Sequence, residues 1–104
     1  MKPYKPPTPE ASLTRSVRAL LNAAGIWHFK HWGGPMGEKG VSDIIGCYQG
    51  RMIALELKAP NGKVSYYQQR FLDSVKAAGG IALVVRSIED VIVGLGLEHR
   101  FLIR

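Results

Sequence analysis

Two apolar segments joined by two turn residues constrain the fold of this chain more than any other feature. Residues 41–48 (VSDIIGCY) and 51–58 (RMIALELK) are rich in strand-forming residues, and Gln49-Gly50 between them has the length and the glycine of a tight turn. Such a pair predicts an antiparallel β-hairpin in which the numbers of opposed residues sum to 99. The hairpin therefore fixes which side chains share a face.

The predicted register places ionisable residues together on one face of the hairpin. Asp43 opposes Glu56, and Lys58 projects from the same face because it lies two residues further along the second strand. Two carboxylates with Cβ atoms about 4.5–5.5 Å apart destabilise a sheet. The rest of this face and the opposite face are apolar, which predicts that both are covered and that charge is costly here.

A hard divalent cation would remove the repulsion between the two carboxylates. Mg²⁺ prefers oxygen ligands, and Lys58 would then orient or deprotonate a metal-bound water or neutralise a phosphate. The alternative is a structural salt bridge, in which Lys58 holds Glu56 and Asp43 caps the end of its strand. The opposed aspartate and the basic charge of the chain favour the metal site.

The segments that flank the hairpin predict an α/β (α+β) domain with the element order α-β-β-β-α-β-α. This order places a mixed sheet between helices on both of its faces. Before the hairpin we expect a helix from Pro9 to Ala24 with Thr8 as N-cap, a strand at 26–32 and a glycine-rich loop at 33–40. After it we expect a helix that Ser65 begins and Gly79-Gly80 ends, a strand at 81–85, and a short helix capped by Ser87. Residues 95–104 fit either a strand or a loop.

The length of 104 residues predicts one domain, from residue 9 to residue 104, after a flexible arm at residues 1–8 that is rich in Lys and Pro. No apolar run approaches the roughly 20 residues that cross a bilayer, and the N-terminus has no apolar signal core. We therefore expect a cytoplasmic protein. Cys47 is the single cysteine, which excludes an intramolecular disulfide and a cysteine zinc site; we expect it to be buried in its strand.

The charge of the chain favours a polyanionic partner. Fourteen Lys and Arg against eight Asp and Glu give a net charge of +6, which attracts nucleic acid over about 10 Å. The aromatic residues could stack on bases, although we expect most of them to pack in the core: Trp27, Trp32, Tyr66 and Tyr67. The predicted DNA contacts are Lys39, Gly40, Lys63, Arg15 and Arg70.

Two other kinds of site are not supported. The glycine-rich loop does not fit the pattern of a nucleotide-binding P-loop, G-x-x-x-x-G-K-[ST]. His28 and His31 are an odd number of residues apart, so on a strand they point to opposite faces and do not form a zinc site.

The motifs of this chain resemble those of the PD-(D/E)xK nucleases, and within them the stand-alone virus-type replication-repair nuclease (VRR-NUC) domain of phages and bacteria. The matching residues are Gly40-Val41-Ser42-Asp43, Glu56-Leu57-Lys58 and Gln68, on strand, strand and helix in that order, with Glu10 matching the glutamate that begins the family's first helix. Ser42 stands where the family usually has proline. The resemblance covers nearly the whole chain and implies a restriction-endonuclease-like α-β-β-β-α-β core.

The resemblance also implies the metal ligands. Asp43, Glu56 and the backbone carbonyl of Leu57 would bind Mg²⁺ or Mn²⁺, and Glu10 would join them directly or through water. Lys58 and Gln68 would complete the catalytic set.

Glu10 and Gln68 also have structural explanations. Glu10 lies on the apolar stripe of the first helix, but an acid in the first turn is equally explained by the helix dipole. Gln68 fits a capping box with Ser65.

These residues predict a Mg²⁺- or Mn²⁺-dependent endodeoxyribonuclease that hydrolyses phosphodiester bonds with a metal-activated water. The resemblance implies a homodimer that resolves four-way (Holliday) junctions in DNA recombination and repair, in a bacterium or a phage-infected cell, because two-fold symmetry places two sites on opposing strands. Residues 91–97 or 101–103 would supply the interface. The alternatives are a flap or nicking endonuclease on other branched or single-stranded DNA, and a DNA-binding module without catalysis.

Overall fold

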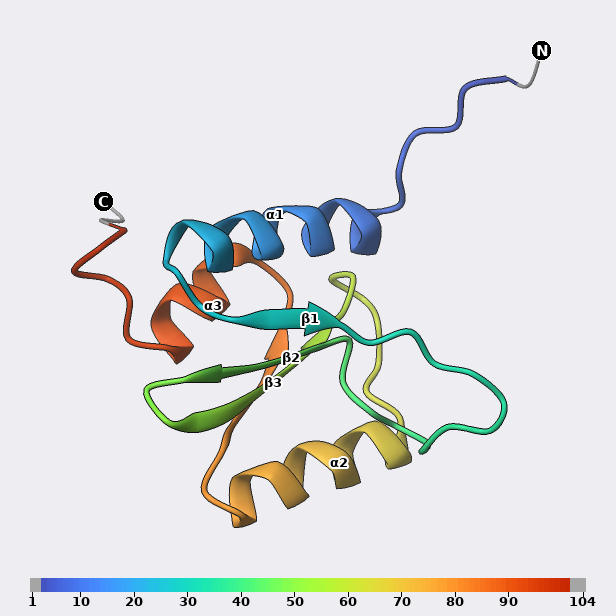
Figure 1. Cartoon of the computed structure of the whole chain (residues 1–104). Coiled ribbons are helices and arrows are strands. Elements are labelled where there is room, and N and C mark those ends of the chain that lie inside the picture. Colours follow the sequence, from blue (N-terminus) through green and yellow to red (C-terminus); the bar gives the residue numbers. More distant parts are fainter. Residues whose placement is uncertain (1–2, 102–104) are drawn as a thin grey trace.

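A four-stranded mixed sheet lies between helices in the computed structural model, which describes residues 3–101 (Figure 1). The strand order is β1-β2-β3-β4, with β3 and β4 parallel and the other neighbours antiparallel. The predicted element order and mixed sheet are confirmed. In chain order the elements are α1 (Pro9–Ala23), β1 (His28–Lys30), β2 (Ile44–Tyr48), β3 (Arg51–Leu57), α2 (Tyr66–Ala77), β4 (Ile81–Val85) and α3 (Ile88–Gly94).

The hairpin of β2 and β3 has the predicted register, with pairs from Ile44–Leu55 to Tyr48–Arg51. Gln49 and Gly50 have positive φ angles of 52° and 79°, as a type I′ turn requires at both central residues. The turn thus sets the pairing of the two central strands and, with it, the side chains that face each layer.

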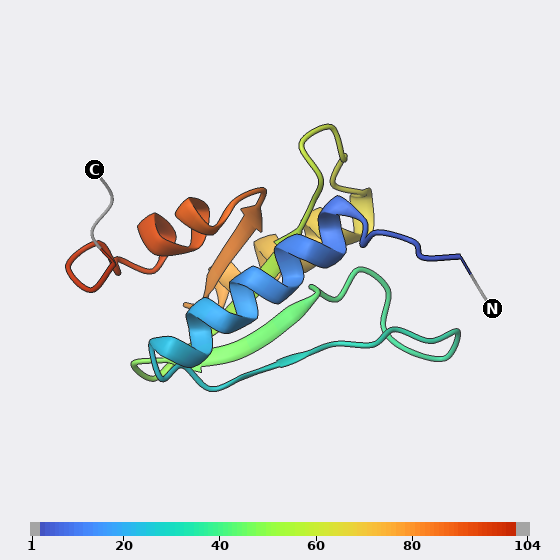
Figure 2. The same ribbon diagram turned by 90° about the horizontal axis from the view of Figure 1, so that it is seen from above.

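Helices cover the two faces of the sheet differently. Figure 2 shows α1 and α3 side by side on one face, and each large side chain buried there contributes about 1.5–3 kcal/mol. This main core includes Val17, Leu21, Ile44, Ile53, Leu55, Leu57, Val85, Val91 and Leu97. On the other face α2 packs on β3 and β4 and forms a smaller core of Ala54, Leu72, Val75 and Ala82.

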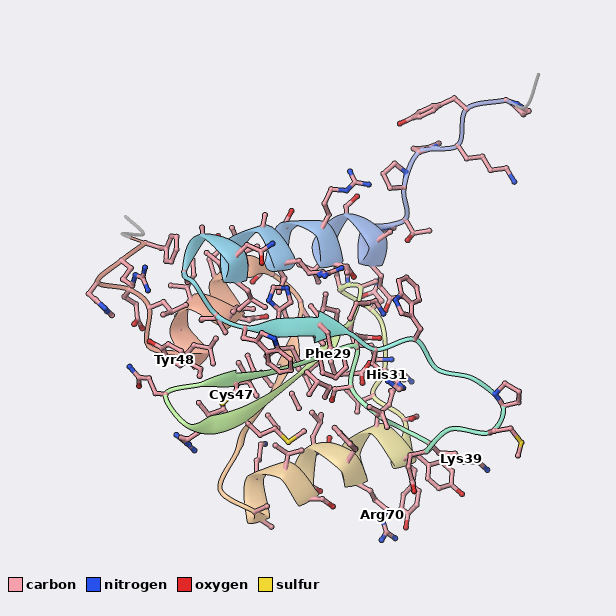
Figure 3. All side chains as sticks on the ribbon, in the orientation of Figure 1. Phe29, His31, Lys39, Cys47, Tyr48 and Arg70 are labelled. Atoms are coloured by element: carbon pink, nitrogen blue, oxygen red, sulfur yellow. The ribbon has the colours of Figure 1, made fainter. Side chains whose placement is uncertain are left out.

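The α2 face remains open near β1, β2 and the start of β3. Four residues, which we call the open patch, are exposed there: Trp27, Phe29, Cys47 and Met52. Figure 3 labels Phe29 and Cys47 among them. The expectations that Cys47 is buried and that both faces are covered were therefore wrong, because α2 lies over the opposite edge of the sheet. The expectation of core packing was also wrong for Trp32, Tyr66 and Tyr67, which are exposed too.

The helix ends follow the sequence closely. Thr8 Oγ1 accepts a hydrogen bond from the amide of Ala11 at 3.1 Å and begins α1. Ser65 and Gln68 form the predicted capping box of α2. Ser87 occupies the N-cap position of α3, but its side chain makes no capping hydrogen bond, so that part of the prediction was wrong.

The chain outside the hairpin differs from the prediction in one strand. The predicted strand at 26–32 is shorter, and residues 95–101, which fitted either a strand or a loop, form turns. In the stretch from Val91 to Leu97, the residues Val91, Ile92, Leu95 and Leu97 belong to the main core, whereas Val93 is 61% exposed. A dimer interface at this stretch stays a prediction. Of the other interface candidate, Phe101 packs against the main core and residues 102–103 lie outside the described part. No helix among residues 3–101 is long and apolar enough to cross a membrane.

Candidate active site

The predicted site residues converge at one end of the sheet. Because β2 runs antiparallel to its neighbours, the start of β2 adjoins the ends of β1 and β3. Asp43 directly precedes β2, Glu56 is the penultimate residue of β3, and Lys58 directly follows β3. Glu10 in the first turn of α1 and Gln68 in the first turn of α2 approach this end from the two helical layers.

Asp43 lies just outside the paired strand and is held by hydrogen bonds to neighbouring strands. Its Oδ2 accepts a hydrogen bond from the amide of Leu57 at 2.8 Å, and its backbone carbonyl accepts one from the amide of His31 at 2.7 Å. Its Oδ1 lies 3.7 Å from Lys30 Nζ, and the side chain is 31% exposed. Oδ2 thus fixes the orientation of the carboxylate, while Oδ1 faces the ammonium group of Lys30.

Glu56 is the most unusual group of the site, since this acidic residue is only 2% exposed. Its Oε2 accepts a hydrogen bond from Gln68 Nε2 at 3.3 Å, and its Oε1 has no hydrogen-bond partner among the described residues. Burial raises the pKa of Glu56 to about 8, and a hydrogen bond to Asp43 and the negative charges of Asp43 and Glu10 add to this, while Lys58 lowers it. The carboxyls of Asp43 and Glu56 therefore adjoin.

A short loop supports Lys58. The Lys58 amide donates to the carbonyl of Val85 at 2.9 Å, and a Cβ at Gly62 would lie 3.4 Å from Lys58 Cδ. Arg86 Nη1 donates to three carbonyls of this loop: Ala59 at 2.8 Å, Pro60 at 3.3 Å and Gly62 at 2.9 Å. Arg86 thus holds the loop against the aliphatic part of Lys58.

Gln68 forms the predicted capping box and also points at the site. Its amide donates to Ser65 Oγ at 3.2 Å, and its side-chain Oε1 accepts from the Ser65 amide at 2.8 Å. Its remaining donor, Nε2, reaches Glu56. The same side chain therefore begins α2 and orients the buried carboxyl.

Glu10 is exposed in the first turn of α1, and its charge raises the pKa of Glu56. No group of three or more His, Cys, Asp or Glu residues within residues 3–101 is placed to hold a metal ion. Glu10 therefore does not complete a three-residue cluster with Asp43 and Glu56 in this conformation.

The donor set fits Mg²⁺ or Mn²⁺. Mg²⁺ is typically held by one or two carboxylates, with waters and substrate phosphate at its other positions. Asp43 and Glu56 supply two adjacent carboxyls, and the Oε1 of Glu56 is a buried acceptor without a partner in the described chain. A buried acceptor left in this state costs about 1–3 kcal/mol, so a bound cation would relieve it. Ser42, where the family usually has proline, is also buried without a partner for its hydroxyl among the described residues.

Three of the five predicted DNA contacts line two grooves. A groove of about 550 Å³, the α2 groove, lies between the glycine-rich loop and α2 and contains Lys39 and Arg70 (Figure 3). Lys39 Nζ lies 5.1 Å from the ring centre of Tyr67, and Arg70 Nη1 donates to Tyr66 Oη at 3.0 Å. The loop approaches α2 closely because Gly40 has a φ of 78° and any Cβ there would collide with the Tyr67 carbonyl.

The second groove, the α1 groove, has a volume of about 590 Å³ and contains Arg15. Its other basic and aromatic lining residues are Arg18, Lys30 and Trp32. Lys63 lies elsewhere, exposed in the segment before α2.

Sequence reasoning missed Lys30 and Arg86. Lys30 pairs in register with Ile44, which brings its side chain to Asp43, but residues 31–43 between the two strands contain no tight turn that would predict this pairing. For Arg86 the sequence holds no signal, because its three partners lie 24 to 27 residues away in a loop.

No family model matches the sequence, and no curated protein matches it. Among solved structures, a chain described as "VRR_NUC domain" is similar to this one, with a TM-score of 0.70 and 20% sequence identity. The similarity covers 93% of this chain and 100% of that one. The chain therefore has the fold of a VRR-NUC domain, and the predicted restriction-endonuclease-like core is confirmed.

Proposed function

We propose that this protein, which has the VRR-NUC fold, is a metal-dependent endonuclease that hydrolyses phosphodiester bonds in DNA. The observation that carries the proposal is the buried Glu56, whose Oε1 lacks a partner among the described residues and whose carboxyl adjoins that of Asp43. Such a pair is costly in a sheet unless it binds a cation. The fold and the net charge of +6 support DNA as the substrate.

The residues of the chain have distinct roles in this proposal. When bound, Mg²⁺ or Mn²⁺ supplies a Lewis acid for the phosphate and lowers the pKa of water. Asp43, Glu56 and the backbone carbonyl of Leu57 hold the cation, and Glu10 reaches it directly or through water. Lys58 positions the attacking water and neutralises charge on the phosphate, while Gln68 fixes the orientation of Glu56.

The proposed substrate is branched DNA, with the four-way junction as the leading case and a homodimer as the active species. A two-fold dimer places two sites on opposing strands of a symmetric junction. The open patch and the outer edge of β1 support self-association, because exposed apolar clusters and unpaired strand edges favour contact between copies. Light scattering at micromolar concentration tests this, and a monomeric mass would remove the basis for paired cuts.

The nuclease proposal is tested by Mg²⁺-dependent cleavage of labelled four-way junction, flap, nicked and linear duplex DNA. We expect wild type to cut the junction, and Lys58→Ala to lose activity by roughly a hundredfold or more. Lys76→Ala is the matched control, since Lys76 is an exposed lysine in the last turn of α2, away from the site. Absence of cleavage of every substrate by wild type contradicts the proposal.

The same assay distinguishes the alternatives. Cutting of flaps or nicked DNA in preference to the junction would identify a different branched-DNA nuclease. A DNA-binding module without catalysis predicts that Asp43→Asn leaves metal affinity unchanged, whereas the proposal predicts a loss.

A further inference from the structure

The α1 groove is a second surface feature next to the active centre. Its wall on one side is the outer surface of α1, with Arg15 and Arg18, and on the other side it is lined by Lys30 and Trp32. Trp32 is 80% exposed. An indole offers a large apolar surface, and none of the catalytic roles assigned above uses this one.

The charge of the α1 groove selects an anion. Its lining residues include three cations and no carboxylate. Arg18 is held in place, because its Nε donates to His28 Nε2 at 3.4 Å while His28 Nδ1 lies 2.9 Å from the carbonyl of Ile26. The last contact makes Nδ1 the donor and leaves Nε2 as the acceptor for Arg18. The groove therefore presents a fixed guanidinium beside an exposed ring.

Lys30 connects this ring to the active centre. Its Nζ lies 4.8 Å from the ring centre of Trp32 and 3.7 Å from Oδ1 of Asp43. Lys30 thus lies between the ring of Trp32 and the carboxylate that is proposed to hold the metal. A nucleotide combines the two chemistries present, an aromatic base and an anionic phosphate.

We infer that the α1 groove binds an unpaired nucleotide adjacent to the phosphodiester bond that is cleaved. The base stacks on the face of Trp32 away from Lys30, and Arg15 and Arg18 contact the flanking phosphates. This inference rests on the proposed nuclease function and specifies its substrate class. Bases within a continuous duplex stack on each other, so they cannot offer a face to Trp32, whereas branch points and single strands can.

The α2 groove is a weaker candidate for this role. The ring of Tyr67, the tyrosine that lines it, is already engaged by Lys39, and the lining includes the carboxylate of Glu38. A groove of this kind suits contact with a phosphate backbone better than insertion of a base.

Binding in EDTA, without cleavage, tests the inference. The probes are a fluorescein-labelled oligothymidylate of about ten nucleotides and a blunt linear duplex of similar length, annealed from two complementary strands. We expect Trp32→Ala to weaken binding of the single strand roughly tenfold, and Trp32→Phe to weaken it less, because stacking on a smaller ring is retained. Binding of the duplex should change less than about twofold, since it depends on phosphate contacts.

Fluorescence supplies a direct readout of stacking, because the chain has two tryptophans. Trp27→Phe leaves Trp32 as the reporter, and Trp32→Phe leaves Trp27, which lies in the open patch on the other face of the sheet. We expect the single strand to quench the first variant and not the second.

Two results would overturn the inference: equal losses of single-strand and duplex affinity in Trp32→Ala, or quenching that is the same in both single-tryptophan variants. The outcome is independent of catalysis. Trp32-dependent binding without any metal-dependent cleavage would refute the nuclease proposal alone, and cleavage without Trp32-dependent binding would refute this inference alone.

Discussion

At the scale of single residues, Glu56 shows how the fold holds a buried carboxyl whose charged form is unfavourable. The carboxyl is enclosed by the α2 face of the sheet and by Gln68, and its pKa is raised to about 8, mainly by burial. Near neutral pH the metal-free protein therefore keeps a proton on Glu56, and a bound cation must displace it. The residue that contributes most to the proposed chemistry is thus one that lowers the stability of the metal-free fold at alkaline pH.

Glu56→Gln is expected to stabilise the metal-free protein at pH 9 but not at pH 4.5. The unfolded carboxyl has a pKa of 4.5 and the folded one a pKa of about 8, so between these values only the unfolded state has released its proton. Wild type therefore loses stability as the pH rises through this window. Because one pKa unit corresponds to about 1.36 kcal/mol, we expect the free energy of unfolding of Glu56→Gln to exceed that of wild type by on the order of 2 kcal/mol or more at pH 9.

Urea unfolding in EDTA at the two pH values measures this difference. Asp73→Asn is a suitable control, because Asp73 is an exposed acid on α2 whose carboxylate accepts from Gln69. A gain for Glu56→Gln that is equal at both pH values would contradict a raised pKa.

At the scale of elements, α2 does more than cover the sheet. Its first turn contains Gln68, which closes the capping box with Ser65 and also donates to Glu56. Helix formation and orientation of the carboxyl therefore depend on the same side chain.

Exchanging Gln68 separates its two roles. Gln68→Ala removes half of the capping box and should lower the free energy of unfolding by about 1 kcal/mol. Gln69→Ala loses an exposed contact to Asp73 and should lower it by less than about 0.5 kcal/mol.

Gln68→Glu preserves the capping box but places a carboxylate beside Glu56. We expect it to be as stable as wild type at pH 5 and less stable at pH 8 in thermal unfolding. Equal effects of the Gln68 and Gln69 variants would contradict this.

The elements also show what the sequence could and could not predict. The hairpin register was predictable because a two-residue turn fixes it locally, and Asp43, Glu56 and Lys58 follow from that register. The contact between Lys30 and Asp43 depends on pairing across residues 31–43, for which no local rule exists. Alternation of side chains along β2 identified the face of Cys47 correctly. It could not show that α2 does not extend over Cys47.

At the scale of the whole molecule, the candidate active site joins layers that are far apart in the sequence. Asp43 precedes β2, Glu56 lies in β3, and Gln68 reaches them from α2. A cation held by the two carboxyls would stabilise the folded state as a whole, since the unfolded chain cannot form the site.

Stabilisation by Mg²⁺ or Mn²⁺ is therefore expected to increase with pH. At pH values below the Glu56 pKa of about 8, the cation competes with a proton for the carboxyl. The apparent affinity for the cation should therefore fall up to roughly tenfold for each pH unit below this value. Titration calorimetry at pH 8.5 and pH 6.5, in two buffers of different ionisation enthalpy, measures both the affinity and the released proton. Affinity that does not change with pH would contradict ligation by Glu56.

The single cysteine of the chain has a practical consequence for the proposed assembly. Cys47 is exposed in the open patch, on the sheet face opposite to the α1 groove. A nitroxide spin label attached there would leave the indole of Trp32 and the carboxyls of Asp43 and Glu56 untouched. In a two-fold dimer, electron paramagnetic resonance would measure one distance between the two labels. That distance would show whether the open patches of two copies meet.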